Sequence, residues 1–277
     1  MLYSQDWQTL SAAYAFIGNS LLMPMNQTSH EGVDPEFWAV FPDLGDGAVR
    51  AAADKLSGWA RRVGEAGEEA AVQEAAVEHT RLFVGPPKPA AAPWETFHRG
   101  SSEVSVGFSR ATYEMRALLR KAGLELSGPS NQYEDHMGVE LLLLSELCRQ
   151  AAEAASARQV SDPDLELRLE LGSELEPEPE PEPASALESE AEFDSGSDQA
   201  VEPGLAPDPD LDFALTAESA KGLFSLEAQV RAFIEEHPLA WVDRLIEAVR
   251  AGAPNGYVDG LLSLERALLE WHRRQLG

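Results

Sequence analysis

The sequence has few basic residues, and this scarcity excludes two classes of partner. Only 21 of its 277 residues are Lys or Arg, against 48 Asp or Glu, so the formal net charge is −27. Nucleic acids and anionic membranes are bound by surfaces rich in Lys and Arg, so neither is expected as a partner. A basic peptide fits this charge better.

Cysteine is scarcer still, and the common motifs of metal and nucleotide sites are missing. The single cysteine, Cys148, cannot form an internal disulfide, which is typical of proteins from a reducing cytoplasm. The sequence has no Cys cluster and no His-x-x-x-His pair, so it predicts no metal site. It also lacks the Gly-x-x-x-x-Gly-Lys-Ser/Thr loop, and no catalytic motif stands out. No cofactor is therefore predicted from the residues.

No apolar run is long enough to span a bilayer. The stretch from Leu10 to Met25 is interrupted by Ser, Gly and Asn. A secretory signal begins with basic residues, yet the first Lys or Arg in the chain is Arg50. We therefore expect this stretch to be the first helix of a cytoplasmic protein that is neither exported nor stably inserted in a membrane.

The negative charge is concentrated in residues 162–218, which hold 19 Asp or Glu against one Arg and account for −18 of the net charge. The run Glu176-Pro-Glu-Pro-Glu-Pro-Glu-Pro183 forbids a regular helix. Because such a segment cannot bury enough apolar surface to offset the entropy of ordering, we expect residues 157–222 to be a disordered insertion. One hypothesis is that it attracts a basic partner over long range, and the alternative is a solvated spacer.

Outside the insertion, apolar residues recur at helical spacing, and no window has the sustained alternation of a β-strand. The pattern predicts an all-α fold of about eight to ten helices in a single domain, built from residues 1–156 and 223–277. Helices are expected at residues 2–23, 35–41, 47–64, 68–83, 108–122, 131–155, 223–236, 239–251 and 257–276.

Two stretches about fifty residues apart carry the functional signal. The first, Arg81-Leu-Phe-Val-Gly-Pro-Pro-Lys-Pro-Ala-Ala-Ala-Pro-Trp-Glu95, runs from the end of a helix into a loop punctuated by Gly and Pro. The second, Glu134-Asp-His-Met-Gly-Val-Glu-Leu-Leu-Leu-Leu144, places an Asp-His pair at the mouth of an apolar helix. By spacing alone, Asn131-x-x-Glu134 also resembles a capping box, and the loop is also compatible with a rigid connector.

Together the two stretches resemble the TorD/DmsD family of cytoplasmic chaperones, which mature molybdenum-containing oxidoreductases and bind their twin-arginine signal peptides. The sequence departs from the family at four positions. Gln132 and Tyr133 stand where the family usually has Glu-Pro, and His79 and Pro87 stand where some members have Trp.

A third segment, Phe233-Ile-Glu-Glu-His237-Pro-Leu-Ala-Trp241, is also similar to the family, where such a stretch opens the last pair of helices. Its spacing favours a simpler interpretation. His237 and Trp241 are four residues apart on one helical face, so a core contact is expected rather than chemistry.

The resemblance implies a chaperone that binds the signal peptide and the immature catalytic subunit of a molybdopterin oxidoreductase of the dimethyl-sulfoxide or trimethylamine-N-oxide reductase type. It would assist cofactor insertion and prevent premature export, as a monomer or homodimer. Asp135 would pair with a peptide arginine. Nucleotide binding, also reported for the family, cannot be assigned to any residue. The binding residues implied are Leu82, Phe83, Pro93, Trp94, Gly107, Glu134, Asp135 and His136.

Two other functions stay open. The departure at Gln132 and Tyr133 is compatible with a chaperone for an enzyme that lacks an export signal, as nitrate-reductase chaperones are. Asp135 and His136 could instead be the acid–base pair of a hydrolase, but no nucleophile or third catalytic group is identifiable. The sequence therefore predicts a binding protein rather than an enzyme.

Overall fold

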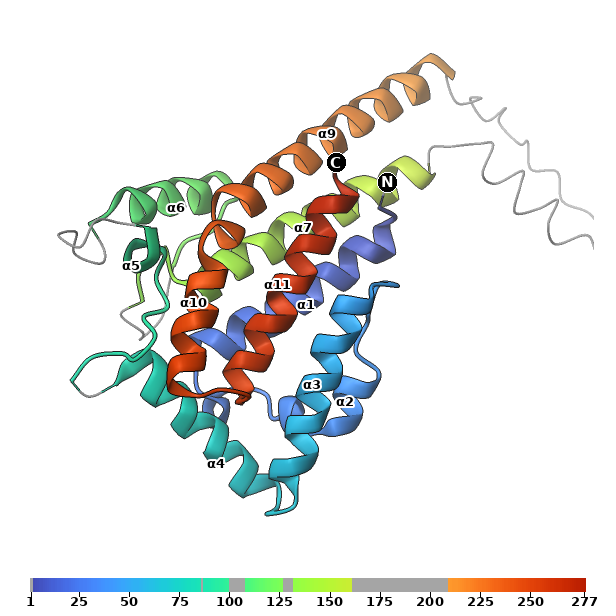
Figure 1. The fold of residues 1–277 in the computed structure, drawn as a ribbon. Helices are drawn as coiled ribbons and strands as arrows, with labels where there is room; N and C mark the ends of the chain where they lie inside the picture. The colour runs from blue at the N-terminus through green and yellow to red at the C-terminus, as the bar shows by residue number, and fades with distance from the viewer. Residues whose placement is uncertain (1, 86, 100–107, 127–131, 161–208) are drawn as a thin grey trace, which may run out of the picture.

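The computed structural model describes residues 2–85, 87–99, 108–126, 132–160 and 209–277. Every regular element in these ranges is helical, which confirms the predicted all-α class (Figure 1). An isolated β-bridge joins Trp94 to His136. The elements are α1 (Ser4–Leu22), η1 (Met25–Gln27), η2 (Glu31–Val33), α2 (Pro35–Ala39), α3 (Gly47–Gly64), α4 (Glu68–His79), a π-helical turn η3 (Thr80–Val84), α5 (Glu95–Arg99), α6 (Arg110–Lys121), α7 (Met137–Val160), α9 (Pro209–Glu236), α10 (Pro238–Gly252) and α11 (Tyr257–Gln275).

Helices α1 and α7 pack antiparallel at the centre of the bundle. Ser11 Oγ donates to the carbonyl of Ser145 at 2.9 Å, and Ser145 Oγ donates back to the carbonyl of Ser11 at 2.8 Å. One heptad further along each helix, a Cβ added to Gly138 would lie 2.6 Å from the carbonyl oxygen of Gly18. Because small residues face each other along the contact, the two backbones approach closely.

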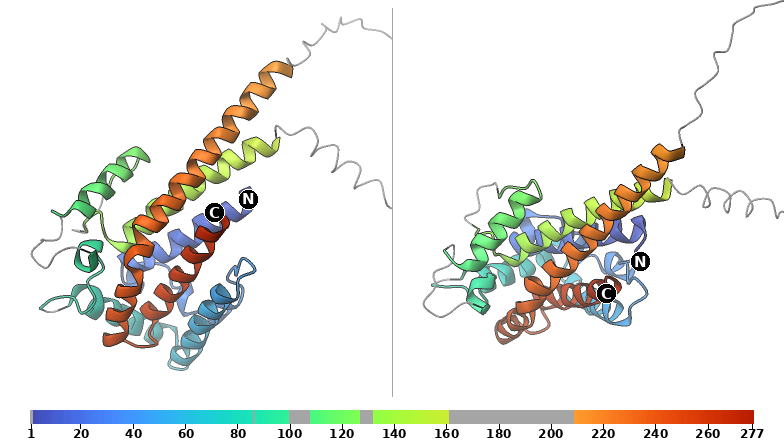
Figure 2. Two further views of the ribbon diagram at one scale, coloured as in Figure 1. Left: turned by 45° about the horizontal axis from the view of Figure 1, so that its top comes forward. Right: turned by 90° about the horizontal axis from the view of Figure 1, so that it is seen from above.

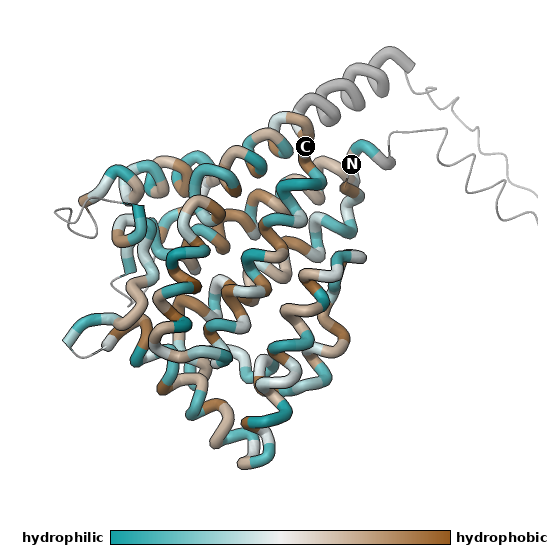
Figure 3. The backbone as a smooth tube through the Cα atoms, viewed as in Figure 1, coloured by the Kyte–Doolittle hydropathy of each residue, from teal (hydrophilic) through white to brown (hydrophobic). Residues whose placement is uncertain are grey.

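The C-terminal helices complete the bundle around this central pair. Helix α9 lies along α7, and the two project together beyond the other helices (Figure 2). Helix α11 packs against α3 and α10 and crosses α1. Apolar and polar residues alternate in short stretches along the helices (Figure 3), so each helix turns one side inward. None of the described helices combines the length and the apolar character that crossing a membrane requires.

Buried carboxylates fix the position of α11. Glu78 of α4 accepts hydrogen bonds from the backbone N–H groups of Tyr257 at 3.2 Å and Val258 at 2.8 Å, which have no partner within their own helix. Asp259 pairs with Lys55 of α3 at 2.7 Å and with Arg250 of α10 at 2.8 Å. One end of α11 is therefore tied to three neighbouring helices.

Two helix boundaries differ from those expected beside the acidic insertion. Helix α7 continues to Val160, and α9 begins at Pro209, within the range 157–222 that was expected to be disordered. A proline at the first helical position followed by acidic residues is a helix-start signal. The signal is present in Pro209-Asp-Leu-Asp212. It lies inside the acidic segment, whose composition favoured disorder over a helix. Residues 161–208, and with them the hypotheses on the role of the insertion, lie outside the described residues.

His272 of α11 predicts a measurable loss of stability in acid. Its ring is fully buried, its Nδ1 lies 3.2 Å from Tyr14 Oη, and its edge faces Trp7. Burial lowers the pKa of His272 from 6.5 to about 3. Because the folded-state pKa is depressed, this stabilising contribution is complete above the unfolded pKa of 6.5 and is lost as the pH falls towards 3.

As the pH falls from about 6 to 4, we expect the native protein to lose unfolding free energy relative to the His272→Gln variant, by about 1.4 kcal/mol per pH unit. Urea unfolding of both proteins at several pH values measures this difference. If the free energies of unfolding of the two proteins changed in parallel with pH, the lowered pKa of His272 would be contradicted.

Candidate functional site

The two motif stretches meet in the fold. The backbone N–H of Glu95 donates to the carbonyl of Asp135 at 2.9 Å, and the N–H of Met137 donates to the carbonyl of Pro93 at 3.0 Å. These bonds form the antiparallel bridge between Trp94 and His136. The Pro-Trp-Glu end of the loop is therefore fixed to the residues that open α7.

The loop that leads to this bridge is held at both of its ends. Gly85 has a φ of 73°, and its N–H closes the π-helical turn on the carbonyl of Thr80 at 2.8 Å. Ala91 then donates to the carbonyl of Leu82 at 2.8 Å. A Cβ on Gly85 would lie 2.0 Å from the carbonyl oxygen of Lys88, so the loop requires glycine at this position.

Asp135 is fully buried and bonded inside the protein. Its carboxylate accepts hydrogen bonds from the backbone N–H of Thr96 at 3.1 Å, from the Thr96 hydroxyl, and from the Thr112 hydroxyl at 2.9 Å. Thr96 belongs to α5 and Thr112 to α6, so Asp135 ties both short helices to the start of α7. The carboxylate faces inward, and a direct ion pair with a peptide arginine is not available in this conformation.

His136 makes the N-terminal contact of α7. Its Nδ1 accepts a hydrogen bond from the N–H of Gly138 at 3.0 Å, and its ring faces Trp94 and Phe83 in edge-on contacts. Burial, together with nearby His79, lowers the pKa of His136 to about 3, so the ring is neutral at physiological pH. The helix that was expected to begin at residue 131 begins at Met137, and its first turn donates a backbone N–H to the side chain of His136. The capping role expected of Asn131 lies outside the described residues.

The other expected site residues are largely covered. Glu134 forms a two-point ion pair with Arg116 of α6, at 2.6 and 3.1 Å, and this pair lowers the pKa of Glu134. Leu82, Phe83 and Pro93 are buried, whereas Trp94 is half-buried. Gly107 lies outside the described residues. The expected carboxylates are thus present, but both already have internal partners.

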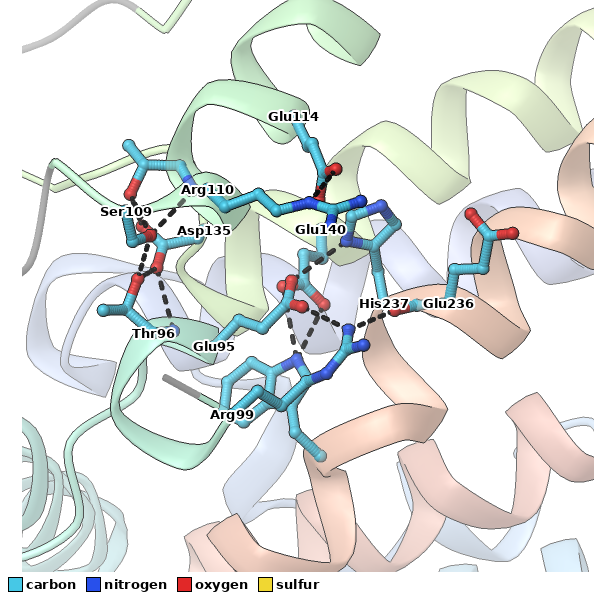
Figure 4. Close-up of polar contacts among 12 residues, drawn as sticks. Glu95, Thr96, Arg99, Ser109, Arg110, Glu114, Asp135, Glu140, Glu236 and His237 are labelled. Atoms are coloured by element: carbon cyan, nitrogen blue, oxygen red, sulfur yellow. Dashed lines mark hydrogen bonds and ion pairs between the residues drawn. The ribbon is translucent and has the colours of Figure 1, made fainter. Parts of the chain in front are cut away.

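A second polar cluster lies beside this bridge and was not predicted from the sequence (Figure 4). Glu95 Oε2 lies 2.9 Å from Nδ1 of His237, and Glu140 accepts from the indole N–H of Trp241 at 3.2 and 3.3 Å. All of these side chains are buried. Burial, and then the nearby Glu95 carboxylate, raise the pKa of Glu140. The carboxylates of Glu95 and Glu140 and the imidazole of His237 each place one ligand atom within 4.8 Å of the other two, and the three could hold a metal ion.

The sequence contained a signal for part of this cluster. Glu140 is the only charged residue in the apolar stretch from Met137 to Leu144, and a lone charge at such a position indicates a buried partner. His237 and Trp241 are both buried, as the expected core contact requires. Their polar partners, however, are Glu95 and Glu140 rather than each other.

A cleft of about 740 Å³ opens next to the cluster, between α5, α6 and the junction of α9 and α10. Its polar lining combines carboxylates with basic side chains; Arg99, for example, bonds both the Glu95 carboxylate and the carbonyl of Glu236. The segments around α5 and α6 also carry exposed aromatic side chains. These are Phe97, Phe108, Tyr113 and Tyr133.

A scan against protein-family models matches residues 43–176 to the family described as nitrate reductase delta subunit. The matched range contains both motif stretches and therefore the bridge between them. No curated protein and no solved structure gives a significant match. The family match confirms the resemblance seen in the motifs, because the matched residues 43–176 are similar to the NarJ/TorD-type family of molybdoenzyme maturation chaperones.

Proposed function

We propose that this chaperone acts in the cytoplasm on the catalytic subunit of a molybdopterin oxidoreductase of the dimethyl-sulfoxide or trimethylamine-N-oxide reductase type. It binds the twin-arginine signal peptide and the immature form of that subunit. Binding shields the signal while the cofactor is inserted, so that the apo-enzyme is not exported prematurely. The mechanism is recognition, without bond chemistry.

The observation that carries the proposal is the cleft beside the bridged motif stretches. A twin-arginine leader has a basic n-region followed by an apolar h-region, so its binding site needs accessible carboxylates next to apolar surface. Glu114 and Glu236 line the cleft and have accessible side chains. Phe97 and Tyr113, which are 58% and 53% exposed, lie on α5 and α6 at the same edge of the bundle. The arginines would bind the carboxylates, and the apolar h-region would cover the aromatic side chains.

In this proposal, the motif residues hold the cleft in shape more than they touch the peptide. Asp135 fixes α5 and α6 through its hydrogen bonds with Thr96 and Thr112. Leu82, Phe83 and Pro93 are buried and anchor the two ends of the loop in the core. The half-buried Trp94 is the one motif residue with aromatic surface left for a partner. Glu134 becomes available to an arginine of the peptide if Arg116 moves away.

Calorimetric titration of the full-length protein with a synthetic twin-arginine leader tests the proposal. The leader should come from the oxidoreductase gene next to that of the chaperone. We expect a Kd of about 1 µM or tighter, and weaker binding of a leader in which both arginines are replaced by lysine. The Glu114→Gln/Glu236→Gln double variant should bind about three- to thirtyfold more weakly, since each of the two exposed ion pairs contributes up to about 1 kcal/mol.

The matched control is the Glu65→Gln/Glu247→Gln double variant, which removes the same charge from exposed positions outside the cleft. It should bind like the native protein. A folded protein that binds no leader but binds an internal segment of the catalytic subunit would refute the signal-peptide proposal in favour of the nitrate-reductase chaperone type.

The geometry gives no support to the hydrolase hypothesis. Asp135 is hydrogen-bonded to Thr96 and Thr112, whereas His136 is hydrogen-bonded to Gly138. Although the two residues are adjacent in sequence, their side chains have different partners. They therefore do not form an acid–base pair.

A further inference from the structure

Three potential metal ligands from distant parts of the chain converge beside the cleft. Glu95 is the first residue of α5, Glu140 lies in the first turn of α7, and His237 lies between α9 and α10. One ligand atom from each side chain lies within 4.8 Å of the other two, and all three residues are buried. We propose that Glu95, Glu140 and His237 form a binding site for one divalent transition-metal ion.

The donor set fits such an ion chemically. Two carboxylate oxygens and one imidazole nitrogen are ligands for Zn²⁺, Mn²⁺, Fe²⁺ or Co²⁺, whereas Ca²⁺ and Mg²⁺ favour sites made of oxygen atoms alone. Bonds of about 2.0–2.2 Å from a central ion place its ligand atoms about 3–3.5 Å apart. The 2.9 Å between Glu95 Oε2 and His237 Nδ1 is close to this spacing, and a carboxylate oxygen of Glu140 lies within 4.8 Å of both atoms.

The charges around the cluster also favour a cation. Glu95 and Glu140 bring two carboxyl groups together in a buried position, which is costly unless positive charge or protons accompany them. Arg99 contacts Glu95, but among the residues that the structure describes Glu140 has only the neutral indole of Trp241 as a hydrogen-bond donor. An ion between the two carboxylates supplies the missing positive charge.

The surroundings provide the supporting contacts and the access that a metal site needs. Trp241 Nε1 holds Glu140, and Arg99 holds Glu95, so each carboxylate is oriented by a neighbour outside the ligand set. Glu95 and His237 both line the 740 Å³ cleft, so an ion can reach them from solvent. Bound metal would link α7 to α5 and to the junction of α9 and α10, two of the elements that frame the proposed client site.

The test is metal binding by the full-length protein, measured after treatment with a chelator. Co²⁺ is the probe because ligation by imidazole changes its visible absorption, and excess Mg²⁺ occupies the many carboxylates elsewhere in the chain. We expect one Co²⁺ ion per chain, displaced by Zn²⁺. The Glu140→Gln and His237→Gln variants should each bind at least about 100-fold more weakly, since each loses one ligand of three.

Matched controls carry the same substitutions outside the cluster. Glu134→Gln removes a partly buried carboxylate paired with Arg116, and His272→Gln removes a buried imidazole near Tyr14. Both should bind Co²⁺ like the native protein. X-ray absorption of the Zn²⁺-loaded native protein, which does not depend on the folding of any variant, should detect one imidazole ligand. Absence of a site of this stoichiometry, ligation by oxygen alone, or equal binding by the ligand variants would overturn the proposal.

Discussion

The Asp135→Ala variant is expected to lose about 3–5 kcal/mol of unfolding free energy, because hydrogen bonds to a buried charged group contribute about 1.5–3 kcal/mol each and are not fully additive. The substitution leaves the Thr96 N–H and the Thr96 and Thr112 hydroxyls without their shared acceptor. It also releases α5 and α6 from the start of α7. Urea unfolding followed by circular dichroism measures the loss.

Asp135→Asn separates a positioning role from direct contact with the peptide. The amide keeps one oxygen acceptor and the shape of the side chain, so we expect it to retain most of the stability and most of the leader binding. If Asp135 instead paired with a peptide arginine, Asn and Ala would weaken binding equally, because both remove the charge. Asp243→Ala is the control for stability, since Asp243 is 63% exposed in its pair with Arg266 and should cost less than about 1 kcal/mol.

Replacing Gly138 by alanine is expected to lower the free energy of unfolding by about 2–3 kcal/mol through overpacking between α1 and α7. The new Cβ would lie 2.5 Å from Cγ of Leu22 and 2.6 Å from the carbonyl oxygen of Gly18. A side chain can rotate away from such a contact, but a backbone carbonyl cannot. The two central helices must therefore separate, and the loss extends to the hydrogen bonds between Ser11 and Ser145.

Gly58→Ala is the matched control. Gly58 lies within α3, and a Cβ at this position meets nothing within 4 Å. Since alanine is the better helix former, the control should be neutral or raise the free energy of unfolding by up to about 1 kcal/mol. If thermal and urea unfolding gave the two alanine variants equal stability, the close approach of α1 and α7 would be contradicted.

The sequence by itself determined the helical class and most helix boundaries. Helix α3 spans Gly47–Gly64 as expected, because Asp46 caps it locally by accepting from the N–H groups of Ala48 and Val49. The exit from the helix before Gly85 was also expected, since a φ of 73° favours glycine. Such features depend on neighbours in sequence, so the local pattern suffices to predict them.

Only the tertiary structure decided the role of the motif residues. The pattern at residues 131–135 is compatible with a helix cap or with a binding carboxylate, and both interpretations depend on which donors reach Asp135. In the fold those donors come from Thr96 and Thr112, and α7 starts only at Met137. The short helix α5 was missed for the same reason, because its position depends on the bridge between Trp94 and His136.

The cluster of Glu95, Glu140 and His237 marks the limit of local inference. Glu95 and His237 are separated by 142 residues, and each has an ordinary interpretation in its own segment, as the end of a loop and as a core histidine. Their chemistry exists only when α5, α7 and the junction of α9 and α10 pack together. Sequence periodicity fixes which face of a helix turns inward, but packing alone fixes which buried polar groups meet there.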